Sequence, residues 1–190
     1  MPKNDQQDAY EKLMSANHSR MIDFTKFAEA KNAALLTFCS VWLGAIITLL
    51  RSPDELPIGF THAFRIALPL LFLAALISLK SLMPELLDKL HKREDEYKNL
   101  LYFGDIHRAG TKAYPEMAAD LYMPTGNDAA TSTYLHDLAV QTAIHAKIAH
   151  RKFRMFNRAG SLVLLAFAIM MGPPVVFCIG WASALLGLSR

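Results

Sequence analysis

Three long apolar segments constrain this chain more than any other feature. Residues 33–50 form an uncharged run of 18 residues, residues 66–79 are apolar for 14 residues, and the segment from Ala159 onward carries no charge until Arg190. A helix needs about 20 mainly apolar residues to cross a bilayer core of about 30 Å. Three such segments in one chain favour membrane helices over the buried core of a soluble protein.

The fold class predicted from these segments is all-α. It is a three-span helical membrane protein with a cytoplasmic helical bundle formed by the amino-terminal arm and the 80–158 insert. The segments in order are a cytoplasmic amphipathic helix (1–31), transmembrane helix 1 (32–51), a short periplasmic loop (52–58), transmembrane helix 2 (59–79), a cytoplasmic sensor region (80–158), transmembrane helix 3 (159–181) and a periplasmic tail (182–190).

Proline and glycine mark where these helices can continue. Neither residue occurs between Lys3 and Trp42, so the amino-terminal arm is expected to run into the first span as one rod. Pro69 is expected to bend the second helix without ending it. At Gly172-Pro173-Pro174 the third helix either kinks or ends, and the sequence leaves both open.

The distribution of lysine and arginine predicts the orientation. The connection between the first two spans carries two basic residues, the amino-terminal arm carries five and the 80–158 block carries twelve. Basic residues are enriched in cytoplasmic segments. The amino terminus and the central block are therefore predicted to be cytoplasmic.

Several functional classes find no support in the composition. A net charge of +3 is too small to indicate nucleic-acid binding. Cys39 and Cys178 lie in apolar stretches without metal or disulfide spacing. The chain has no nucleophile elbow, phosphate loop or dinucleotide fingerprint, and no histidine pair with zinc spacing and a glutamate base. We expect neither an enzyme nor a metal or cofactor site.

Within the central block, three helical stretches are predicted. The first continues from the second span with an apolar face marked by Leu82 and Leu101, and ends near Gly104 as a glycine cap. The second covers about 114–122 and is followed by a loop at 124–128. The third begins near Thr131 and continues into the last span.

Three stretches of the chain resemble the transmembrane effectors of the Pycsar antiphage systems of bacteria. They are Glu29-Ala30-Lys31-Asn32-Ala33-Ala34-Leu35-Leu36, then Leu100-Leu101-Tyr102-Phe103-Gly104-Asp105-Ile106 with the later Tyr114, and Asp137-Leu138-Ala139-Val140-Gln141 with Ile148 and Lys152-Phe153. These motifs are loose, and their order and spacing carry the resemblance. The family more often has Asp where Glu29 stands.

The resemblance implies an effector that binds a cyclic pyrimidine mononucleotide, cUMP rather than cCMP, made by a partner pyrimidine nucleotide cyclase. It further implies that the effector acts on the lipid bilayer, impairs the inner membrane and causes abortive infection. A homo-oligomer is expected from the small residues of the third span, which allow close helix contact: Gly160, Ser161, Ala166, Ala168 and Gly172. An alternative from another class is a membrane scaffold or toxin with no nucleotide ligand, acting through protein partners.

A cyclic mononucleotide needs a cation, a stacking surface and amide groups for the base edge. The candidates are Arg108 and Lys152 for the charge, Tyr102, Phe103 and Tyr114 for stacking, and Asn99 and Gln141 for the edge. Lys112 is a further cation in the same stretch. Structural roles compete with these: a core position is favoured for Phe103, and a membrane-flanking charge for Lys152. Glu29 and Lys31 are expected to form a pair that orients the first helix at the interface.

Overall fold

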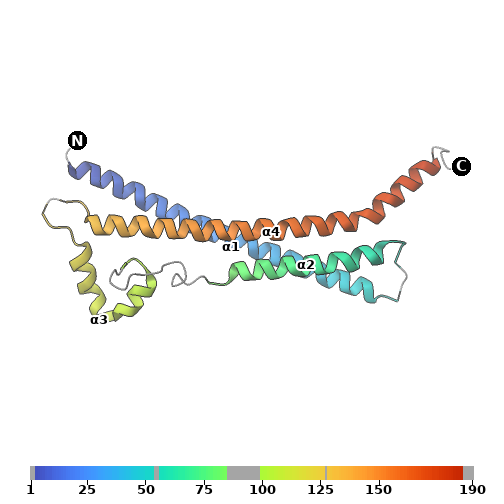
Figure 1. Cartoon of the computed structure of the whole chain (residues 1–190), viewed down its shortest axis with the longest axis horizontal. Coiled ribbons are helices and arrows are strands. Elements are labelled where there is room, and N and C mark those ends of the chain that lie inside the picture. The colour runs from blue at the N-terminus through green and yellow to red at the C-terminus, as the bar shows by residue number, and fades with distance from the viewer. Residues whose placement is uncertain (1–2, 54–55, 85–98, 127, 186–190) are drawn as a thin grey trace. The chain divides into compact units, whose positions relative to one another are not determined.

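The computed structural model describes residues 3–53, 56–84, 99–126 and 128–185. Over these residues the protein is all-α, as predicted, and contains no strand. Its helices are α1 (Lys3–Arg51), α2 (Phe60–Leu82), α3 (Phe103–Tyr122) and α4 (Ser132–Leu185), shown in Figure 1. The chain divides into a first unit, Met1–Phe27 with Pro84–Arg151, and a second unit, Ala28–Met83 with Lys152–Arg190. Both α1 and α4 pass from one unit into the other.

The second unit is a three-helix apolar assembly. Each of its helices contains an 18-residue window of high mean hydropathy, 2.2 in α1, 1.9 in α2 and 2.5 in α4, and each is long enough to cross a membrane. Small side chains with no exposed surface, such as Ala67 and Ala166, bring the helices together around Ile46 and Leu71. Large apolar side chains cover the outside, which suits contact with lipid.

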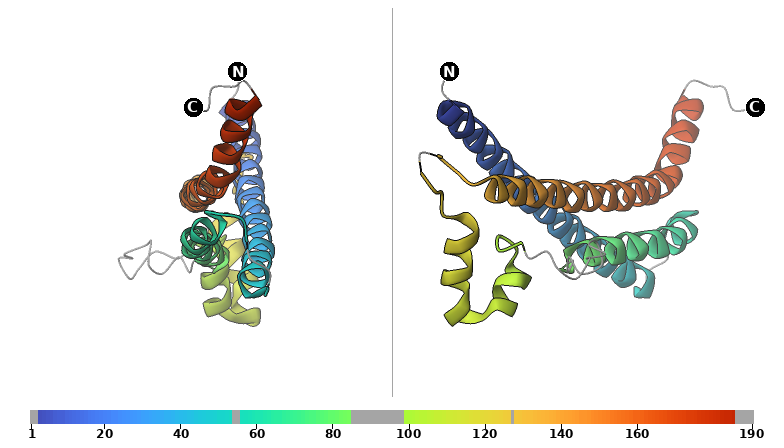
Figure 2. Two further views of the ribbon diagram at one scale, coloured as in Figure 1. Left: turned by 90° about the vertical axis from the view of Figure 1, so that its right-hand side faces the viewer. Right: turned by 60° about the vertical axis from the view of Figure 1, so that its left-hand side comes forward.

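The helices of this unit are unbroken, including at Pro69 and at Gly172-Pro173-Pro174. α1 runs unbroken from the arm into the first apolar segment, as the single-rod prediction states. Pro69 lies inside α2. α4 continues past Gly172-Pro173-Pro174, and Figure 2 shows its carboxyl-terminal part bending away from the preceding part.

The first unit contains α3, which has two parts. Gly110 adopts φ 76° and ψ 162°, a left-handed φ that only glycine takes without strain, and the helix turns sharply there (Figure 2). The prediction that a helix ends at Gly104 is wrong, because α3 begins at Phe103. The predicted helix that precedes it falls mainly on residues 85–98, outside the described residues.

Candidate functional site

A buried polar turn precedes α3 in the first unit. The Asn99 N–H donates to Asp105 Oδ2 at 3.0 Å, and Asn99 Oδ1 accepts from the Leu101 N–H at 3.0 Å. The Asn99 side-chain amide donates to the Asp137 carbonyl at 3.3 Å. Asp105 is in the first turn of α3, where a carboxylate also interacts favourably with the helix dipole. These bonds fix the start of α3 and tie it to α4.

Tyr122, the last residue of α3, closes the same network. Its hydroxyl donates to Asp137 Oδ2 at 2.5 Å and accepts from the Leu100 N–H at 3.0 Å. Asp137 has no exposed surface and Asp105 is 3% exposed, so both carboxylates depend on protein partners. Among the residues that the structure describes, no group of three or more His, Cys, Asp or Glu side chains forms a metal-binding cluster.

The two aromatic residues at the start of α3 have different surroundings. Tyr102 is buried and packs with Ile144 and Ile148 of α4. Phe103 is 60% exposed, with its ring centroid 4.7 Å from that of Tyr102. The expectation of a core position for Phe103 is therefore wrong, and Tyr102 takes that position instead.

Gly104 is required by this packing rather than by a helix cap. A Cβ atom at Gly104 would lie 2.5 Å from Cε1 of the Tyr102 ring. Any larger residue would therefore displace Tyr102 from α4. The Leu-Tyr-Phe-Gly run thus places one aromatic ring in the core and leaves its neighbour open to solvent.

Gln141 lies on the buried face of α4, one turn after Asp137. It is only 4% exposed, yet among the described residues none forms a hydrogen bond with its side-chain amide. An amide offers two donors and an acceptor, and burying it without partners costs free energy. Gln141 is therefore one polar group of this unit whose hydrogen bonds a ligand would complete; Gln7 Oε1 and His145 Nδ1 are also buried without a hydrogen-bond partner among the described residues.

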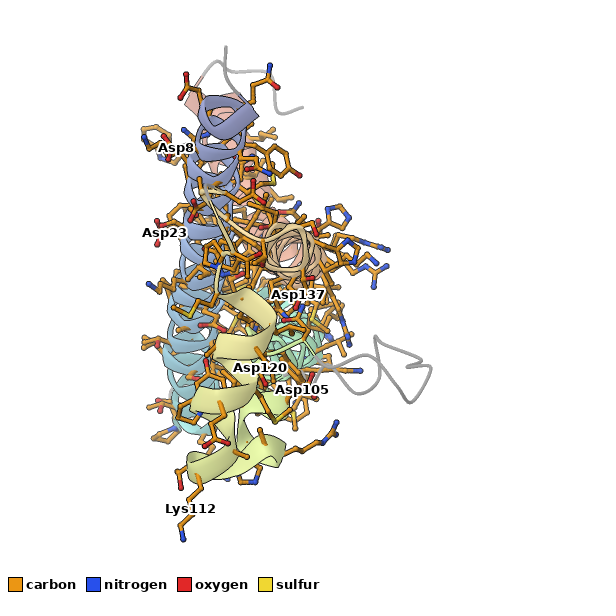
Figure 3. The ribbon with its side chains drawn as sticks, turned by 90° about the vertical axis from the view of Figure 1, so that its left-hand side faces the viewer. Asp8, Asp23, Asp105, Lys112, Asp120 and Asp137 are labelled. Atoms are coloured by element: carbon orange, nitrogen blue, oxygen red, sulfur yellow. The ribbon has the colours of Figure 1, made fainter. Side chains whose placement is uncertain are left out.

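The exposed cations of α3 differ in their surroundings. Arg108 forms an ion pair with Asp105 at 3.5 Å, and its side chain remains 59% exposed. Lys112 points away from Asp105 and Asp137, as Figure 3 shows. Tyr114 is half-buried on the part of α3 that follows Gly110. Arg108 thus combines a fixed position with an accessible charge.

The remaining three candidates lie in the second unit. Lys152 is 3% exposed, donates to the Ser81 carbonyl at 2.6 Å and pairs with Glu29 Oε1 at 3.1 Å. Lys31 Nζ lies 5.4 Å from the centroid of the Phe156 ring. The structure thus places Asn99, Tyr102, Phe103, Arg108, Tyr114 and Gln141 in one unit and Glu29, Lys31 and Lys152 in the other.

Asp105, Tyr122 and Asp137 were not among the residues predicted for a site. A signal was present for one of them, because Asp137 and Gln141 are four residues apart and share a helix face with Ile144 and Ile148. Two polar residues on a face that is otherwise apolar indicate a buried polar network. No comparable pattern marks Asp105 or Tyr122.

Two histidines of the first unit predict a dependence of stability on pH. The rings of His18 and His145 meet edge to face with centroids 5.2 Å apart. Burial lowers the pKa of His18, and burial together with the charge of His18 lowers the pKa of His145, both below 6.5. The unfolded chain then binds more protons than the folded one. The contribution of the two neutral histidines to the free energy of unfolding is therefore fully present above pH 6.5 and is lost as the pH falls below it.

We expect His145→Leu to reduce this loss of stability at acidic pH (the acid loss). The substitution removes one titrating group and its charge repulsion on the other. Melting temperatures of the detergent-purified protein across this pH range measure it. His150→Leu, at an exposed position of the same helix, is the control and should leave the acid loss unchanged. An acid loss in His145→Leu equal to that of the parent protein would contradict a role for this pair.

Comparison with known proteins places these features in a family. Residues 13–185 match the family described as the Pycsar effector protein domain. A relative in a Rhizobium species, the Pycsar effector protein RsPycTM, is 78% identical over 169 residues, which cover 89% of this chain and 97% of the relative. No solved structure matches the chain.

Proposed function

The chain belongs to the Pycsar effector family, and from that premise we propose that its first unit senses a cyclic pyrimidine mononucleotide and its second unit impairs the inner membrane. The messenger is made by a partner pyrimidine nucleotide cyclase, and the outcome is abortive infection in antiphage defence. The observation that carries the sensing role is Gln141, a buried amide without a partner among the described residues.

The first unit contains the groups that such a ligand needs. Gln141 offers donors and an acceptor for the base edge. Phe103 exposes 60% of its surface and can stack on a base, and Tyr114 is a second aromatic candidate. Arg108 supplies an accessible positive charge for the single phosphate. Asn99 and Tyr102 hold the turn that carries Phe103 and Arg108.

The three apolar helices support the proposed action on the bilayer. Arg151, Arg154 and Arg158 are exposed where α4 approaches its apolar segment, which favours a cytoplasmic position for this end of the spans. α1 and α4 continue from the first unit into the second without a break. A ligand that shifts either helix in the first unit would therefore shift a span.

Assembly as a homo-oligomer is part of the proposal. Ser161, Ala168 and Gly172 are small, exposed and aligned along one side of α4. Small residues of this kind allow close contact between membrane helices. Cross-linking in membranes, with and without nucleotide, should give products larger than the monomer. A monomer under both conditions would exclude assembly as a homo-oligomer.

Thermal stability with added nucleotides tests the sensing role. A ligand that binds only the folded state at 100 times its Kd stabilises it by about 2.7 kcal/mol. We expect cUMP to raise the melting temperature of the detergent-purified protein, with a smaller shift for cCMP and none for cAMP or cGMP. Arg108→Ala should weaken the shift, and Lys112→Ala is the matched control.

Leakage from vesicles tests the membrane role separately. The reconstituted protein should release a trapped dye when cUMP is added and retain it without the nucleotide. No melting shift with any of the four nucleotides, in a folded protein, would instead support a scaffold or toxin that acts without a nucleotide.

A further inference from the structure

A layer of polar groups, all buried except Glu29, crosses the three-helix second unit. Glu29 and Asn32 contribute from α1, Ser78 and Ser81 from the end of α2, and Lys152 from α4. The exposed fractions are 0% for Asn32 and Ser78, 2% for Ser81 and 3% for Lys152. Polar groups buried to this extent between helices cost free energy unless they are hydrogen-bonded.

Lys152 joins all three helices of the unit. Its ammonium donates to the Ser81 carbonyl at 2.6 Å, in the last turn of α2, where the helix dipole favours a cation. It also pairs with Glu29 of α1 at 3.1 Å. Its own backbone carbonyl accepts from the Asn32 amide at 3.3 Å. If α1 or α2 moved away from α4, the buried Lys152 ammonium would lose its contact with Glu29 or with the Ser81 carbonyl.

The other polar atoms of the layer lack such bonds. Asn32 Oδ1, Ser78 Oγ and Ser81 Oγ are buried, and none has a hydrogen-bond partner among the described residues. Each of them would gain a hydrogen bond if water reached the layer. The layer therefore favours hydration, while the bonds of Lys152 resist the separation that hydration requires.

We infer that this layer is a site of water entry into the membrane unit and that Lys152 holds it shut. The inference rests on the proposed membrane function, for which water entry between the spans would be the opening step. Glu29 is 46% exposed, so the ion pair is the part of the closure that water can reach first. Breaking it removes the side-chain link between α1 and α4 at this level, while the bond from Lys152 to the Ser81 carbonyl still joins α4 to α2.

The accessibility of Ser78 to a water-soluble thiol reagent tests the inference. The reporter Ser78→Cys is placed in a Cys39→Ala, Cys178→Ala background and reconstituted in lipid nanodiscs, which expose both membrane faces. We expect Lys152→Met to speed labelling at position 78 by about tenfold or more without any nucleotide, because the ammonium that links α4 to both α1 and α2 is lost. Lys152→Arg should keep labelling slow.

A second reporter distinguishes local opening from unfolding. Ala67 lies nearer the other end of α2 and has no exposed surface, so labelling of Ala67→Cys should stay slow in Lys152→Met. Unchanged labelling at position 78 in Lys152→Met overturns the inference. If position 67 becomes accessible as well, Lys152→Met has unfolded the unit, and the same labelling is measured in Glu29→Gln. Faster labelling of Glu29→Gln at position 78 alone supports the role of the ion pair in excluding water. Unchanged labelling there overturns the inference. Because no nucleotide is used, a failure of nucleotide sensing leaves this result intact.

Discussion

Replacing Asp137 with alanine is expected to lower the free energy of unfolding of the first unit by roughly 3 kcal/mol. The carboxylate has no exposed surface and accepts a hydrogen bond from the Tyr122 hydroxyl at 2.5 Å. The substitution removes the charge-assisted bond from the Tyr122 hydroxyl and opens a cavity. Hydrogen exchange should report the loss at residues 99–105, because the Leu100 N–H depends on Tyr122.

Asp120→Ala is the matched control for this prediction. Asp120 is exposed on α3 (Figure 3), so its loss should change the free energy of unfolding by no more than about 0.5 kcal/mol. Tyr122→Phe should fall between the two, since it removes the hydroxyl and keeps the ring. Equal effects of Asp137→Ala and Asp120→Ala would show that the network does not hold α3 on α4.

The membrane helices could be predicted from the sequence because their determinants are local. Uncharged runs of sufficient length define each span, and the absence of proline and glycine from Lys3 to Trp42 predicts the continuity of α1. The same reasoning located the start of α4 near Thr131, whose hydroxyl accepts from the Tyr134 N–H at 3.1 Å as a helix cap. Patterns within one helix are enough for such predictions.

The start of α3 could not be predicted in this way. A glycine after an apolar helical stretch usually indicates a helix end. The structure instead needs Gly104 because the Tyr102 ring occupies the space of a Cβ atom. Tyr102 is held there by Ile144 and Ile148, more than forty residues away, and Asn99 bonds to a residue 38 positions along the chain. Contacts of this range leave no local periodic pattern.

Lys152 illustrates the same limit at the candidate site. Next to Arg151 and Arg154, it has the sequence context of a membrane-flanking cation or a phosphate ligand. Its partner Ser81 is 71 residues away, and neither its burial nor its bond to a backbone carbonyl depends on the local sequence. Gln141 was identified from sequence because an amide on an apolar helix face stands out whatever its partners are.

Replacing Gln141 with leucine should have two opposite effects. Without ligand, the free energy of unfolding should rise by about 1 kcal/mol, because a buried amide with no partner among the described residues is replaced by an apolar group of similar size. With cUMP, binding should weaken by about 1–3 kcal/mol, roughly tenfold to a hundredfold in Kd. Melting temperatures with and without cUMP measure both effects in one experiment.

Gln6→Leu provides the matched control, since Gln6 is exposed on α1 and should change neither quantity appreciably. A Gln141→Leu protein that is less stable without ligand would mean that the amide serves the fold. An unchanged response to cUMP would remove Gln141 from the binding site. A more stable protein that no longer responds would identify a residue retained for recognition at the expense of stability, which is the balance expected at a binding site.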